Sequence, residues 1–176
     1  MQADLGKNYF ELFGLPVTYE VDLADLASRY RELQRRFHPD RYAAGPDSER
    51  RLSVQMAAQI NAAYQALRDP VARGRYLLGL GGVNTDEETD TRMDPAFLME
   101  QMELREALDN ARQASDRAAR AATLQSQVAA MLASRIKILH QAFAGPSAAS
   151  LPQARTVVRE LQFLQKLAAE IDTLDL

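Results

Sequence analysis

The sequence predicts an all-α protein built from two helical units. Two stretches, 23–37 and 52–67, place apolar residues at the three- and four-residue spacing of an amphipathic helix. Residues 81–92, which follow these two stretches, have neither helical nor strand periodicity and separate them from the second half of the chain. We therefore expect an N-terminal helical hairpin with short flanking helices, followed by a C-terminal three-helix bundle.

The first predicted helix, within residues 9–15, is short and apolar, and Gly14 and Pro16 bring it to an end. Asp22 is a good N-cap for the second helix, and Asp25 lies in its first turn, where a negative charge suits the helix dipole. The apolar stripe of this second helix consists of Leu23, Leu26, Ala27, Tyr30, Leu33 and Phe37. The remaining arc carries the basic residues Arg29, Arg31, Arg35 and Arg36.

The second helix runs directly into the tripeptide His38-Pro39-Asp40. Proline disfavours the α conformation for the residue before it and offers no amide hydrogen, so the helix should stop at His38. The sequence therefore predicts that the tripeptide is presented on an exposed turn. A basic helix face that leads to such a turn favours docking onto a partner over simple solvation.

A turn-rich connection then leads to the antiparallel partner helix, whose apolar stripe is Leu52, Met56, Ile60, Ala63, Tyr64 and Leu67. Asp69-Pro70 should end this helix and open another short one, and the first domain, 1–80, should close near Leu80. We expect a linker at 81–94. Asp94 and Pro95 then form a helix start that opens the second domain, 95–176.

Three helices are expected in the second domain, at about 95–115, 121–144 and 151–173. The first of them carries more apolar side chains than one core stripe needs. Phe97, Leu104, Leu108 and Ala111 suffice as that stripe, while Leu98, Met99 and Met102 lie about 150° away, beside Glu103, Glu106 and Asn110. In the third helix Phe163 lies about 130° from the stripe centre. We expect these surplus residues to form a binding surface, although a bundle that buries both sides of the helix is an even alternative.

Composition argues against several classes of function. The chain has no cysteine and only two histidines, so it lacks thiolate chemistry and a histidine cage, and we expect no metal and no cofactor. Residues 1–80 hold 11 basic and 10 acidic side chains and residues 81–176 hold 10 and 14, which is not the balance of a nucleic-acid-binding protein. No apolar run approaches the roughly twenty residues of a membrane helix, and Met1–Lys7 lacks a targeting pattern, so we expect a cytoplasmic protein.

His38-Pro39-Asp40 after a basic helix resembles the signature of J-domain co-chaperones. The stretches 8–15 and 60–70 resemble the opening and third helices of the same domain. Farther along, 97–106 and 161–167 are similar to the C-terminal domain of the HscB co-chaperones, so that the resemblance covers nearly the whole chain.

The resemblance implies a protein that catalyses nothing itself. It implies that the J-domain docks on an HscA-type ATPase chaperone and stimulates its ATP hydrolysis, through Arg31, Arg35, Arg36, His38, Pro39 and Asp40. It also implies that the bundle binds the iron–sulfur scaffold IscU, through Leu98, Met99, Met102, Glu103, Glu106 and Phe163. Asn110 stands where relatives can have another acidic residue.

Three other functions are alternatives. A general J-domain co-chaperone that serves other protein clients is the most serious of them. A nucleic-acid-binding module would need a basic balance, which Asp25, Glu32 and Asp40 oppose. An enzyme would need a base or nucleophile beside His38, and no such constellation is readable.

Overall fold

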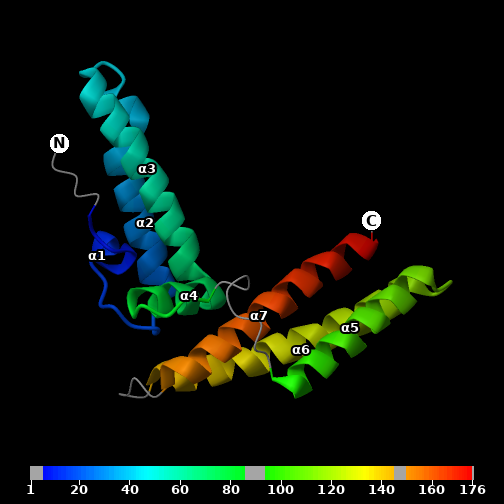
Figure 1. Cartoon of the computed structure of the whole chain (residues 1–176). Coiled ribbons are helices and arrows are strands. Elements are labelled where there is room, and N and C mark those ends of the chain that lie inside the picture. Colours follow the sequence, from blue (N-terminus) through cyan, green and yellow to red (C-terminus); the bar gives the residue numbers. More distant parts are fainter. Residues whose placement is uncertain (1–5, 86–93, 145–149, 176) are drawn as a thin grey trace. The chain divides into compact units, whose positions relative to one another are not determined.

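The structure is a computed structural model that describes residues 6–85, 94–144 and 150–175. Within these ranges all regular structure is helical, as predicted (Figure 1). The chain divides into two compact units, Met1–Leu77 and Leu78–Leu176. Each unit is described by itself below.

The first helix of the N-terminal unit, α1 (Tyr9–Phe13), is a short helix closed by its caps. The side chain of Asn8 accepts a hydrogen bond from the backbone amide of Glu11, and the Glu11 carboxylate accepts one from the amide of Asn8. Gly14 follows in the left-handed conformation, with φ of 64°, which a residue without Cβ adopts at no steric cost. The predicted end of this helix is therefore confirmed.

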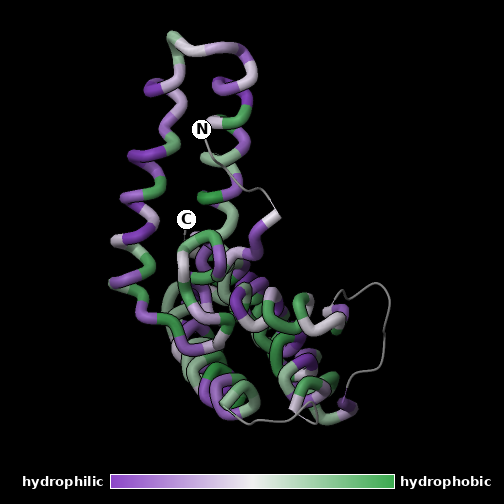
Figure 2. Tube along the Cα trace, turned by 90° about the vertical axis from the view of Figure 1, so that its left-hand side faces the viewer, coloured by the Kyte–Doolittle hydropathy of each residue, from purple (hydrophilic) through white to green (hydrophobic). Residues whose placement is uncertain are grey.

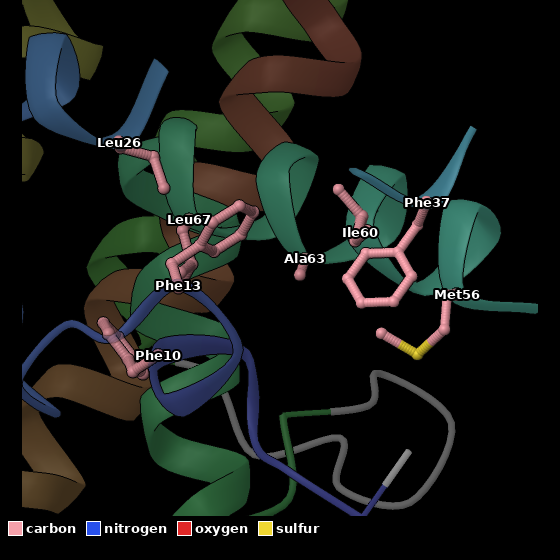
Figure 3. Close-up of a cluster of buried hydrophobic side chains, with 8 residues drawn as sticks. All are labelled: Phe10, Phe13, Leu26, Phe37, Met56, Ile60, Ala63 and Leu67. Atoms are coloured by element: carbon pink, nitrogen blue, oxygen red, sulfur yellow. The ribbon is translucent and has the colours of Figure 1, made fainter. Parts of the chain in front are cut away.

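The hairpin consists of α2 (Leu23–Phe37) and α3 (Asp47–Arg68), which lie side by side in Figure 1. The Asp22 carboxylate accepts hydrogen bonds from the amides of Ala24 and Asp25, as its predicted role as N-cap requires. Hydrophilic and hydrophobic positions alternate by helical turn along both helices (Figure 2). The buried faces meet α1 in one apolar core, shown in Figure 3, of Phe10, Phe13, Leu26, Phe37, Met56, Ile60, Ala63 and Leu67.

A short helix, α4 (Pro70–Leu80), follows α3 and ties the ends of this unit together. The buried guanidinium of Arg73 donates a hydrogen bond of 2.6 Å to the carbonyl of Leu67, one of the last carbonyls of α3. It also lies over the ring of Tyr19, at 4.8 Å from the ring centre, and the burial of Tyr19 raises the pKa of its hydroxyl. The hydroxyl of Tyr76 accepts a hydrogen bond from the amide of Tyr9, so α4 also holds the start of α1.

The second unit contains the three predicted long helices, α5 (Pro95–Gln113), α6 (Arg117–Ala144) and α7 (Leu151–Asp172), followed by a 3₁₀ turn, η3 (Thr173–Asp175). The expected core stripe of α5 is buried throughout. Its residues pack with side chains of the other two helices in a core of Leu104, Leu108, Ala121, Leu124, Val128, Leu164, Leu167 and Ile171. Asp94 caps α5 as expected, since its side chain accepts from the amide of Ala96.

One helix begins earlier than predicted: α6 starts at Arg117 and not near residue 121. Its first turn is rich in alanine, a strong helix former that gives no apolar periodicity to detect. Asp116 stabilises this start, because its carboxylate accepts a hydrogen bond of 2.8 Å from Arg120, a bond that lowers the pKa of Asp116.

Several predicted features lie wholly or partly outside the described residues. They are the N-terminal segment 1–5, most of the linker predicted at 81–94, and the Gly145-Pro146 stop. The boundaries expected at residues 80 and 95 stay a prediction. Among the described helices, none is long and apolar enough to cross a membrane.

Candidate functional site

The tripeptide His38-Pro39-Asp40 lies on an exposed turn at the end of α2, where the sequence placed it. His38 is the C-cap, with φ of −59° and ψ of 128°, the extended conformation that a following proline favours. Pro39 then opens a single 3₁₀ turn, η1 (Pro39–Tyr42), whose amide at Asp40 donates 3.3 Å to Nδ1 of His38. The side chain of Asp40 is 89% exposed. A partner can therefore reach both side chains.

Two residues that the sequence analysis did not single out hold this turn against α2. The Arg41 guanidinium donates 3.2 Å to the carbonyl of Arg35, and the Tyr42 hydroxyl donates 3.1 Å to the carbonyl of Arg36. The last carbonyls of a helix have no hydrogen-bond partner within the helix, and these two side chains supply donors for the carbonyls of Arg35 and Arg36. The turn is thus fixed by side chains that follow the tripeptide as well as by the proline ring.

Beside the tripeptide is a surface hollow of about 570 Å³, lined by Arg31, Gln34, Arg35, His38 and Arg41. It brings together three residues of the predicted chaperone-binding set and adds Gln34 and Arg41. Arg36 does not line it and instead lies over the ring of Phe37, at 5.2 Å from the ring centre. Positions 31, 34, 35 and 38 repeat at helical spacing and so lie on one face of the helix. Helical spacing could therefore have predicted Gln34 as part of this face, whereas a search for charged residues alone omits it.

A polar network that joins α2 to α3 holds Gln34 in place. Its amide nitrogen lies 2.6 Å from the Tyr30 hydroxyl and 3.0 Å from the side-chain oxygen of Asn61 on α3. The Tyr30 hydroxyl donates 2.9 Å to the same Asn61 oxygen, and its ring stacks on Tyr64 with centres 4.0 Å apart. One wall of the hollow is therefore fixed across both helices of the hairpin.

Arg29, which the sequence placed on the same basic arc, has a structural role. Its Nε donates 2.9 Å to Asp25, and another guanidinium nitrogen donates 3.0 Å to the carbonyl of Phe13 at the end of α1. Arg29 thus joins α2 to α1. By contrast, no ion pair links Arg31 or Arg35 to a carboxylate within the described ranges.

In the second unit, α5 exposes the surplus apolar residues instead of burying them. Leu98 is exposed, and Met99 and Met102 are 65% and 71% exposed, so the alternative of a bundle that buries both sides of this helix is wrong. Glu103 and Glu106 on the same arc are exposed too, and neither forms an ion pair within the described part of the chain. We call Leu98, Met99, Met102, Glu103 and Glu106 the α5 patch; Asn110, one turn beyond it, is also exposed.

Phe163 on α7 is half-buried, which corrects the expectation of an exposed aromatic. Its ring meets Phe97 edge to face, with centres 5.8 Å apart, because the side chain leans from α7 toward α5. Counting 100° per residue along α5, Leu98 and Arg105 project about 80° to 100° from Phe97, on the side that continues into the α5 patch. Phe163 therefore borders the patch and belongs partly to the core.

Among the described residues no cluster of three or more histidine, cysteine, aspartate or glutamate side chains is placed to hold a metal ion. What the two surfaces do offer is an exposed acid–imidazole turn beside guanidinium groups, and a methionine-rich patch edged by carboxylates. Both suit recognition of protein partners.

Comparison with known proteins matches both units. Residues 8–76 match the family described as the DnaJ domain, and residues 93–172 match the HSCB C-terminal oligomerisation domain. A co-chaperone protein HscB homolog of Vibrio vulnificus is 44% identical over 168 residues, which is 96% of either chain. The structure of the chaperone HscB from Vibrio cholerae has a TM-score of 0.82 at 41% identity and covers 96% of this chain and 98% of its own. The human co-chaperone protein HscB has a TM-score of 0.89 at 29% identity and covers 99% of this chain and 85% of its own.

Proposed function

The chain belongs to the HscB family of co-chaperones, and on that premise we propose that it binds an IscU-type iron–sulfur scaffold, delivers it to an HscA-type ATPase chaperone and stimulates that chaperone's ATP hydrolysis. It thereby aids the maturation of iron–sulfur proteins. The observation that carries the proposal is the His38-Pro39-Asp40 turn, held open at the end of α2 by Arg41 and Tyr42.

The J-domain acts as a regulator of the chaperone and supplies no reacting group. Arg31, Arg35 and Arg36 attract an acidic chaperone surface, while His38 and Asp40 engage it at the turn. Stimulation requires that the co-chaperone bind the hydrolysis-competent conformation of the chaperone more tightly than the others, since equal binding shifts no equilibrium. A turn fixed before binding loses little conformational freedom on docking, which favours such discrimination.

The scaffold binds at the α5 patch, together with the accessible part of Phe163. Flexible methionine side chains adapt to a partner surface, and the aromatic ring offers a rigid anchor. Glu103 and Glu106 at the rim select a partner with positive charge at the matching positions. The two surfaces belong to different units, so the two binding sites share no residue.

The test is steady-state ATP hydrolysis by an HscA-type chaperone, measured with the chain alone, with an IscU-type scaffold alone and with both. We expect stimulation by the chain, and further stimulation when the scaffold is added. A pull-down from a cell lysate, with the α5 patch variant Met99→Ala/Met102→Ala as the matched bait, identifies the clients. Failure to stimulate would exclude the proposed J-domain activity. Patch-dependent capture of many unrelated proteins without the scaffold would favour the general co-chaperone.

A further inference from the structure

An ion pair between α5 and α7 lies beside the ring that borders the α5 patch. Arg105 on α5 places its guanidinium carbon 5.6 Å from the ring centre of Phe163 on α7. Two oxygens of Glu170 accept from one nitrogen of the same guanidinium, at 2.7 and 2.8 Å. Phe163 and Glu170 are seven residues apart, about two helical turns, so both side chains project from one face of α7. Arg105 is thus held between a carboxylate and an aromatic ring of the same helix.

The ion pair is not what joins the two helices. Both side chains are partly exposed, and exposed ion pairs contribute little to stability. Buried leucines of α5 and α7 already pack together in the core of this unit. The effect of fixing Arg105 is therefore best sought at the ring that it covers.

Arg105 limits the orientations that the half-buried ring of Phe163 can adopt. Phe97 meets this ring edge to face on one side, and the guanidinium covers it on another. A planar guanidinium stacks on an aromatic ring in a way that an ammonium group cannot. A ring that is fixed before a partner arrives loses less conformational freedom on binding, so the same contact gives a higher affinity.

We propose that Arg105 is a positioning residue of the scaffold surface: held by Glu170, it sets the ring of Phe163 at the border of the α5 patch before the scaffold binds. This inference rests on the proposed function, because it names how one anchor of the scaffold is held. Arg105 itself need not touch the scaffold, since its effect passes through the ring.

Arg112 offers a matched control on the same helix. Its guanidinium also donates to Glu170, at 3.5 Å, and to Asp109 at 3.0 Å. Its side chain is 44% exposed, close to the 46% of Arg105. No aromatic ring among the described residues lies against it. Replacing either arginine by glutamine therefore removes one positive charge and one partner of Glu170, but only one of the two changes uncovers a ring.

The first measurement is the Kd for the scaffold, by isothermal titration of the full chain, beside a melting curve that shows each variant to be folded. We expect Arg105→Gln to raise the Kd about fivefold, because the scaffold must then order the ring itself. Arg112→Gln should stay within about twofold. Arg105→Lys, which keeps the charge but not the planar group, should recover only part of the affinity. Equal effects of the two glutamine variants would overturn the proposal.

A double-mutant cycle separates positioning from direct contact with the scaffold. In a Phe163→Leu background there is no ring to position, so adding Arg105→Gln should raise the Kd by no more than about twofold. A loss as large as in the parent background would mean that Arg105 contacts the scaffold directly, and the positioning role would be wrong.

A last measurement needs no scaffold. The ring signals of Phe163 are followed by NMR in the free chain, with ¹³C-labelled phenylalanine and with Phe163→Leu to assign them. Arg105→Gln should shift these signals and Arg112→Gln should leave them in place, whereas unchanged signals in Arg105→Gln would refute the role of Arg105. Should the parent not bind the scaffold at all, the proposed function falls, and the ring signals still decide whether Arg105 positions Phe163.

Discussion

The guanidinium of Arg105 covers the ring of Phe163, with its central carbon 5.6 Å from the ring centre. Two oxygens of Glu170 accept from the same guanidinium at 2.7 and 2.8 Å, which fixes it over the ring. Phe163 is therefore enclosed by Phe97 from α5 and by Arg105 above it. The residue joins α7 to α5 and also borders the α5 patch, so its two roles need separate tests.

We expect Phe163→Ala to lower the free energy of unfolding by about 1 to 3 kcal/mol. This is less than a fully buried phenylalanine costs, because part of the ring is accessible, but it includes the lost edge-to-face contact. Thermal and urea unfolding measure the change. Leucine at this position keeps most of the apolar volume and should recover much of the stability, whereas an unchanged melting curve for the alanine variant would mean that the ring does not brace the bundle.

Met99→Ala together with Met102→Ala should melt like the parent and bind the scaffold more weakly. Surface substitutions change stability by within about 0.5 kcal/mol, whereas each methionine that fills a desolvated pocket contributes roughly 1 to 4 kcal/mol to binding. Isothermal titration with the scaffold gives the affinity. Val54→Ala, which truncates an exposed apolar residue of α3 in the other unit, is the control. Scaffold affinity equal to that of the parent would remove the methionines from the interface.

Asp40→Asn should abolish stimulation of the chaperone ATPase without unfolding the protein. The side chain is 89% exposed, so the substitution should change stability by within about 0.5 kcal/mol, yet it removes the charge at the turn. Steady-state hydrolysis beside a melting curve checks both halves of the prediction. Full stimulation by the folded variant would take Asp40 out of the docking mechanism.

Docking on the chaperone should weaken steeply with salt, and binding of the scaffold should respond less. Arg31 and Arg35 are exposed and unpaired within the described chain, so their attraction to a partner is screened over a Debye length of about 8 Å at physiological ionic strength. The scaffold surface relies more on apolar contacts. Titrating salt while each binding reaction is measured separately decides the matter. Equal insensitivity would mean that the arginines are only solvated.

The sequence predicted several helix ends well because a residue with a local physical effect lies at each of them. Asp22, Asp94 and Pro39 act on their own neighbours, so their roles can be inferred without a structure. Helix α6 escaped this reasoning at its start, where alanines form helix without an apolar stripe. The arc of the α5 patch was also predictable, because helical periodicity alone separates Met99 and Met102 from the core.

The sequence was less informative where a side chain bonds to a distant part of the chain. Arg29 lies on the basic arc, yet its bond to the carbonyl of Phe13 depends on how α1 packs against α2. The half-burial of Phe163 depends likewise on a helix that begins more than fifty residues earlier. Periodicity gives the direction in which a side chain leaves its own helix, but not what it meets there.

A polar bridge inside the second unit joins all three helices. Arg135 on α6 donates 3.1 Å to Glu160 on α7 and 2.6 Å to Glu100 on α5. The side chain of Glu160 is only 17% exposed, and this burial raises its pKa in spite of the neighbouring arginine. The nearby carboxylates Glu100 and Asp94 add to the rise.

Glu160 should make the bundle lose stability as the pH rises from about 4.5 toward neutrality. A carboxyl group whose pKa is higher in the folded than in the unfolded state binds more protons when folded between those two values. The free energy of unfolding therefore falls as pH rises through that window, and the stabilising contribution is complete only below the ordinary pKa.

Glu160→Gln abolishes this titration while its amide oxygen can still accept from Arg135. The melting temperature of the parent minus that of the variant should consequently be larger at pH 4 than at pH 7. Glu103→Gln, which removes a carboxylate from the exposed patch, separates the effect of net charge from that of burial. If the difference for Glu160 grows with pH instead, the ion pair with Arg135 outweighs burial, and the direction of the pKa shift inferred from the geometry is wrong.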